Sequence, residues 1–229
     1  YYLPVHIHLA ETLNENRQIE EAYGCRPLAY LQKAGLLDGI KLLAAHGVWL
    51  NQDEIELLAE VDASVAHNPC SNMKLASGIA PVGDMLAAKL NVSLGTDSAC
   101  SNNNLDMFQE MRTAAYLGKI KNLDPKALPA GEILSMATVN GAEALGLYDV
   151  GTLSVGKKAD LILLNTDTPH FTPVFDWVSH LVYAASGSDV DSVIVDGRLV
   201  VEKRKALYLD EEKIIYEAEN AAQRLLSAL

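Results

Sequence analysis

The chain has 229 residues, of which 49% are hydrophobic, and its formal net charge is -12. This length allows one large domain or two small ones with a buried core. The acidic balance excludes a nucleic-acid partner, because such a surface needs positive charge, and no apolar run is long enough to suggest a membrane partner. Three widely spaced cysteines argue against a disulfide framework and favour a cytoplasmic location.

Short apolar strands alternate with helices through the first hundred residues. The expected strands span residues 3–9, 41–45, 63–66 and 91–95. Helices are expected at about 17–34, from the cap at 51, and at 81–89, with a polar loop at 71–74. Strands joined through helices need crossover connections, so this alternation predicts an α/β fold with a parallel sheet.

The second part of the chain has a different character. Helices are expected at 103–117 and 130–145, followed by antiparallel strands with a tight turn at Asp196-Gly197. The amphipathic pattern from Asp210 onward predicts a final helix that packs on the body. We therefore expect three parts: residues 1–148, a β-rich segment at 149–205, and a terminal helix within 206–229.

Each expected parallel strand ends at an ionisable side chain, namely His8, His46, His67 or Asp97. A single buried histidine or turn aspartate is more often a structural residue than a functional one. The carboxyl ends of parallel strands, however, lie along one rim, so these four side chains should converge although they are far apart in the sequence. Ionisable groups gathered in this way are typical of a functional site.

Imidazole and carboxylate groups at one rim are ligand types that suit zinc or iron(II). A metal of this kind makes bound water acidic enough to act as a nucleophile near neutral pH. Glu11 lies three residues after His8, where it can transfer protons beside the metal without binding it. The pattern predicts a metal-dependent hydrolytic enzyme.

Four motifs carry a resemblance to a known family. They are His8-Leu-Ala-Glu11, Ala-Ala-His46-Gly, His67-Asn-Pro-Cys-Ser-Asn-Met-Lys, and Gly-Thr-Asp97-Ser. Together they resemble the amidohydrolase superfamily, and within it most closely the 5'-methylthioadenosine/S-adenosylhomocysteine deaminases. Guanine deaminases and triazine chlorohydrolases are near relatives of that group.

The resemblance implies a (β/α)8 barrel of which this chain is the second half, strands five to eight, followed by part of a small β-sandwich. It implies that His8 and Asp97 bind Zn²⁺, with Fe²⁺ as an alternative, and that Asp97 takes a proton from the attacking water. Glu11 would bind the substrate and shuttle its proton, and His46 would stabilise negative charge or orient the water. Three further residues would shape the substrate pocket: His67, Ser71 and Asn72.

The family's His-x-His pair at the first barrel strand has no counterpart here. His6-Ile7-His8 imitates that pair, but the Glu11 that follows places it at strand five. We therefore expect the chain to be the C-terminal part of a longer polypeptide whose upstream half supplies the missing ligands. The oligomeric state stays open, with a homo-oligomer as one option.

The implied reaction is hydrolytic deamination of an adenine nucleoside thioether, a small molecule, with release of ammonia. Two alternatives remain. One is hydrolysis of another heteroaromatic ring, of the guanine deaminase or triazine chlorohydrolase type, and the other is an inactive fragment that binds no metal without its upstream ligands.

Overall fold

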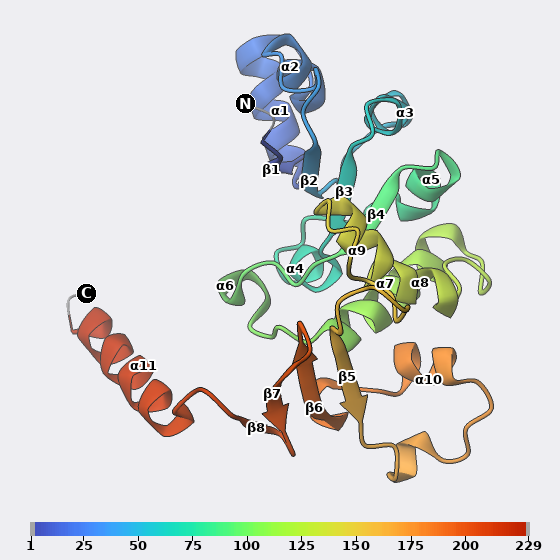
Figure 1. Cartoon of the computed structure of the whole chain (residues 1–229). Helices are drawn as coiled ribbons and strands as arrows, with labels where there is room; N and C mark the ends of the chain where they lie inside the picture. Colours follow the sequence, from blue (N-terminus) through green and yellow to red (C-terminus); the bar gives the residue numbers. More distant parts are fainter. Residues whose placement is uncertain (1–2, 228–229) are drawn as a thin grey trace.

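A parallel sheet forms the first half of the molecule, and the computed structural model describes residues 3–227 (Figure 1). Its four strands lie in the order of the sequence: β1 (Val5–Leu9), β2 (Leu42–His46), β3 (Ser64–His67) and β4 (Asn91–Leu94). All neighbouring pairs are parallel, as the sequence predicts. The helices between the strands are α1 (Leu13–Tyr23), α2 (Pro27–Lys33), α3 (Gln52–Glu60), α4 (Pro69–Lys74) and α5 (Val82–Ala87).

One row of the sheet shows how its two faces differ. Ile7, Ala44, Val65 and Val92 pair across the strands and belong to or pack on the hydrophobic core. The core therefore lies between the sheet and its covering helices. Since successive residues of a strand point to opposite faces, the next row, which contains His8, lies on the other face.

Local sequence signals fix the limits of the first helices. Thr12 caps α1 in a reciprocal capping box with Glu15, and Gly24 ends the helix in a left-handed conformation at φ 69°. Pro27 then occupies the start of α2. The helical region expected at about 17–34 is thus divided into two helices, at Gly24 and Pro27. Asn51 caps α3 as predicted.

The short helix α4 replaces the polar loop expected at 71–74. Pro69 begins the helix, where its fixed φ is favourable and its missing N–H costs no hydrogen bond. Ser71 and Asn72 are buried, at 0% and 1% exposure, because both side chains point to partners within the protein. The polar composition of residues 71–74 therefore led to the wrong expectation of a loop, where the structure has a buried helix.

The helices after β4 also differ in their limits from those expected. They are α6 (Ala99–Asn102), α7 (Met107–Asn122), α8 (Ala130–Met136) and α9 (Val139–Ala144). The Asp106 side chain caps α7, which therefore begins later than residue 103. The helix expected at 130–145 is divided at Thr138, whose backbone (φ -131°, ψ -92°) is not helical.

A second, antiparallel sheet follows in the order β5 (Leu161–Leu164), β6 (Val190–Val195), β7 (Arg198–Glu202) and β8 (Lys205–Ala206). The turn between β6 and β7 is Asp196-Gly197, with φ of 49° and 76°, as a tight hairpin requires. The β-rich character expected for this region is confirmed. Residues 151–160 form no strand, and 165–189 contain η1 (Pro169–Phe171), α10 (Trp177–Tyr183) and η2 (Gly187–Asp189).

The last helix, α11 (Glu211–Leu226), forms as predicted but does not pack on the body. It projects away from both sheets (Figure 1), and none of its residues is buried. Ile214, Ile215 and Leu225 are 48%, 59% and 71% exposed. Amphipathicity predicts an apolar face, but it does not say what covers that face.

The division of the chain into three parts, at residues 148 and 205, stays a prediction.

No helix within residues 3–227 combines the length and hydrophobicity that a membrane crossing requires.

Two glycines in helices test how tightly the core is packed. A Cβ on Gly118 of α7 would lie 2.7 Å from Cγ of the buried Leu128, whereas one on Gly131 of α8 would meet nothing within 4 Å. We expect Gly118→Ala to destabilise the protein by about 1–3 kcal/mol through overpacking. The control Gly131→Ala should stabilise it by roughly 0.4–1 kcal/mol. Urea unfolding of both variants measures the difference, and equal effects would contradict the packing described.

Candidate active site

Three of the predicted strand-end side chains meet at one point. Ligating atoms of His8, His46 and Asp97 all lie within 4.8 Å of one another. The imidazole rings of His8 and His46 stack, with their centroids 5.2 Å apart. His8 is on β1, His46 ends β2 and Asp97 follows β4, so the parallel register brings them together from distant parts of the chain.

The buried His46 presents one nitrogen to this point. Its backbone is left-handed at φ 75°, and its side chain has 0% exposure. Nδ1 lies 2.8 Å from Oδ1 of Asn72 and 3.5 Å from Nδ2 of Asn68. The closer amide oxygen favours the tautomer in which Nδ1 donates its proton and Nε2 carries the lone pair. Nε2 is buried, has no hydrogen-bond partner among the described residues, and lies 3.8 Å from Oε2 of Glu11. A free lone pair inside a polar site is suited to a metal or a water.

Asp97 is held by three donors. Its Oδ2 accepts hydrogen bonds of 2.6 Å from the hydroxyls of Ser71 and Ser101, and its Oδ1 accepts one of 2.8 Å from the backbone N–H of Ser98. Burial raises the pKa of Asp97, but these hydrogen bonds and the nearby His46 outweigh it and hold the pKa below its ordinary value. Asp97 is therefore ionised at neutral pH.

Glu11 faces His46 from the end of β1. Its Oε1 accepts a 3.2 Å hydrogen bond from the hydroxyl of Ser77, and its own backbone N–H donates to Oε2 of Glu15 at 2.7 Å. The capping box of α1 thus fixes the turn that carries Glu11. The general acid or base predicted from its spacing to His8 thus lies 3.8 Å from Nε2 of His46.

The three residues predicted to shape a pocket are all buried: His67, Ser71 and Asn72. Ser71 binds Asp97, and Asn72 binds His46, so each holds a residue of the site. Burial, and then the neighbouring His46, lower the pKa of His67 to about 4, so it is neutral at physiological pH. Contact of these residues with a substrate stays a prediction.

Sequence reasoning missed the residues that orient the site. Ser101 and Ser77 donate to Asp97 and Glu11, yet nothing in their spacing distinguishes them from other polar loop residues. Gly95 offers a clearer signal, since a Cβ there would lie 2.5 Å from Oδ1 of Asn68. A glycine between a strand and a predicted ligand can indicate such a close approach.

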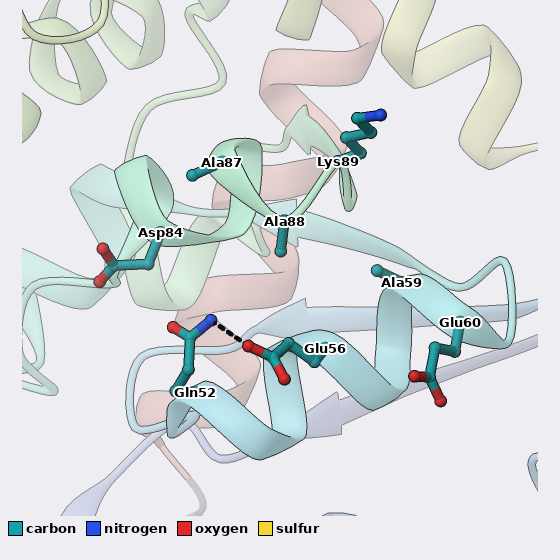
Figure 2. A pocket seen from close by; sticks show the side chains of 8 residues that line it. All are labelled: Gln52, Glu56, Ala59, Glu60, Asp84, Ala87, Ala88 and Lys89. Carbon is teal, nitrogen blue, oxygen red and sulfur yellow. Dashed lines mark hydrogen bonds between the residues drawn. The ribbon is translucent and has the colours of Figure 1, made fainter.

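A groove elsewhere lacks this chemistry. It lies between α3 and α5, has a volume of about 650 Å³, and is lined by three carboxylates, three alanines, one glutamine and one lysine (Figure 2). Gln52 and Glu56 join across one turn of α3 by a 2.7 Å hydrogen bond. None of the lining residues is a histidine. The strand ends are therefore the better candidate site.

The residues at the strand ends fit a zinc ion. The imidazole of His8 and the ionised carboxylate of Asp97 are donors that zinc accepts, and catalytic zinc sites use three protein ligands or more with one open position. The buried, unpartnered Nε2 of His46 supports this reading, because buried polar atoms are normally satisfied.

Four parallel strands with these side chains at their carboxyl edge are the arrangement expected of the second half of a (β/α)8 barrel. The model of the amidohydrolase family matches residues 1–200. The chain belongs to the amidohydrolase family, as the four motifs predict.

The relatives carry related names. A 5-methylthioadenosine/S-adenosylhomocysteine deaminase of Pelotomaculum thermopropionicum is 54% identical over 97% of this chain and 51% of its own length. A 5'-deoxyadenosine deaminase of Methanothermobacter thermautotrophicus is 52% identical over 97% and 52%, respectively. The chain thus spans about half the length of the curated relatives it matches.

Solved structures show the same relation. An adenosine deaminase of Xanthomonas campestris with bound zinc superposes with a TM-score of 0.94 at 40% identity, covering 98% of this chain and 51% of that one. An atrazine chlorohydrolase of Arthrobacter aurescens complexed with zinc superposes with a TM-score of 0.84 at 28% identity, covering 95% and 48%. The expected half-barrel is confirmed.

His67 should make stability depend on pH. Its pKa is about 4 in the folded protein and about 6.5 when unfolded, so the stability it contributes is complete above pH 6.5. As the pH falls from 6.5 toward 4, His67 becomes protonated in the unfolded state but not in the folded state. The free energy of unfolding therefore decreases by up to about 1.4 kcal/mol per pH unit. We expect His67→Gln to lose this part of the pH dependence. Urea unfolding at pH 7 and pH 5 measures it, and identical pH slopes would contradict a buried neutral His67.

Proposed function

We propose that the full-length protein containing this chain is a metal-dependent aminohydrolase. In the proposed reaction, water replaces the 6-amino group of an adenine nucleoside thioether, 5'-methylthioadenosine or S-adenosylhomocysteine, and ammonia leaves. The convergence of His8, His46 and Asp97 is the observation that carries this proposal. The names of the relatives support the substrate class.

Zinc is the metal we propose, because solved neighbours contain it. His8 and Asp97 would hold it together with ligands from the upstream half of the polypeptide. When bound, zinc supplies Lewis acidity that brings the pKa of water near 7. Iron(II) accepts the same imidazole and carboxylate donors and remains the alternative.

The side chains of this chain divide the proton transfers. Asp97, ionised and aimed by two serines, accepts the proton that water loses. Glu11 delivers a proton to the ring nitrogen, which takes the C=N π electrons as water forms the new C–O bond. A second proton on the amine then lets it leave as ammonia with the electrons of the C–N bond. His46, locked through Asn72, presents Nε2 to orient the water or to stabilise the developing charge.

Three other substrates have specific support: 5'-deoxyadenosine, guanine and the triazines. Relatives named 5'-deoxyadenosine deaminase are as similar to this chain as those named for the thioethers. The substituent at the 5' carbon of the substrate is therefore the feature that the names leave undecided. The guanine deaminase of E. coli and the triazine hydrolases share the fold at 28–29% identity. The thioether remains our choice because relatives at 51–54% identity include it by name. We place the enzyme in the cytoplasm, where Cys25, Cys70 and Cys100 would stay free thiols.

Turnover by the full-length protein tests the substrate class. We expect ammonia release from 5'-methylthioadenosine and S-adenosylhomocysteine with a kcat/KM at least about tenfold higher than from guanine, and no chloride release from a chlorotriazine. Ammonia and chloride assays measure the two reactions. Preference for guanine or for the triazine would overturn the assignment, and loss of turnover after chelation would confirm the need for metal.

Asp97→Asn separates chemistry from folding. The substitution keeps the shape of the side chain but removes its charge, so we expect kcat to fall roughly 10²- to 10⁴-fold and the zinc content to decrease. Asp62→Asn is the matched control, because Asp62 is exposed and has a similar left-handed backbone, at φ 55° against 59° for Asp97. Steady-state kinetics and zinc analysis should leave the control unchanged. Full activity in Asp97→Asn would refute the role given to Asp97.

A further inference from the structure

We propose that Glu110 is a positioning residue that holds, through one carboxylate, both segments whose hydroxyls orient Asp97. Glu110 lies on α7 and is only 1% exposed. It forms no salt bridge within residues 3–227. Burying a carboxylate without a cation is costly, so its presence here calls for an explanation beyond packing. The proposal rests on the proposed function, since it concerns how Asp97 is held for that reaction.

Each carboxylate oxygen of Glu110 accepts from a different segment. Oε2 accepts a 3.1 Å hydrogen bond from the backbone N–H of Cys70, in the first turn of α4. Oε1 accepts a 2.7 Å hydrogen bond from Nδ2 of Asn102, the last residue of α6. The two segments are about thirty residues apart in the sequence, and Glu110 connects both of them to α7.

The residues next to these two anchors are the ones that hold Asp97. Ser71 follows Cys70, and Ser101 precedes Asn102, and both hydroxyls donate to Oδ2 of Asp97 at 2.6 Å. Asn102 also donates to the backbone carbonyl of Thr96, directly before Asp97, at 2.6 Å. Glu110 therefore binds the residue next to each serine whose hydroxyl fixes the Asp97 carboxylate.

A carboxylate is the side chain that this place requires. The backbone N–H of Cys70 and Nδ2 of Asn102 donate to Glu110, and the Cys70 thiol also faces it. A carboxylate of this size offers these donors two acceptor oxygens and no competing donor. Glutamine has the same shape but would turn an N–H₂ group toward one of the two donors. Either Cys70 or Asn102 would then lose its hydrogen bond to residue 110, while the volume of that side chain stays the same.

The test compares the full-length protein with its Glu110→Gln variant. Hydrogen–deuterium exchange reports on the anchors without any turnover, and we expect faster exchange in residues 69–74, in 96–103, or in both. In steady-state kinetics we expect kcat to fall about tenfold while KM stays within about twofold, because the loss affects how the carboxylate is aimed in the transition state.

A second variant keeps the test sharp if Glu110→Gln folds poorly. Asn102→Ala removes the donors to Thr96 and Glu110 but leaves the Cys70 anchor, so exchange should quicken in 96–103 and not in 69–74. Ile133→Val on α8 is the stability control, since Ile133 is fully buried and belongs to the hydrophobic core. It should lower Tm slightly and leave kcat and exchange in both segments unchanged.

The outcomes separate this proposal from the proposed function. If wild-type protein turns over no nucleoside but Glu110→Gln still loosens the segments, the function fails and the positioning role stands. If the variant keeps wild-type exchange in both segments, or if its loss of activity lies in KM alone, the positioning role is overturned.

Discussion

The parallel pairing of four neighbouring strands is the constraint on which the rest of the structure depends. It places the carboxyl ends of β1, β2 and β4 along one edge, so that His8, His46 and Asp97 meet although almost ninety residues separate the first from the last. The strands have apolar side chains facing the helices, and this burial fixes the register. A shift of one residue would turn His8 away from the site.

The site is also shaped by backbone conformations that most residues avoid. His46 and Asp97 both have positive φ, at 75° and 59°. Such conformations cost free energy and persist where the surrounding contacts determine them. Here those contacts come from Asn72 on His46 and from Ser71 and Ser101 on Asp97. The polar shell therefore offsets strain at the same residues whose direction the chemistry needs.

Sequence periodicity was sufficient for the parallel sheet and for the convergence of the strand ends, because both follow from alternation of apolar strands and helices. It was insufficient for α4, since Ser71 and Asn72 are buried for their hydrogen bonds and not for their hydrophobicity. The apolar stripe of α11 likewise gave the helix but not its surroundings. Long-range polar contacts such as Glu110 with Cys70 leave no periodic signal.

The open edges of the sheet bear on how the metal site would be completed. Among the described residues, β1 and β4 each pair on one side only, and barrels avoid such edges by closure. The relatives are about twice as long as the segment they share with this chain. Half of a barrel can aim His46 and Asp97 because their partners, Asn72, Ser71 and Ser101, all lie within the same half, and the His8 ring stacks on His46. Orientation of these side chains is thus encoded here, independently of the ligands that the other half is proposed to supply.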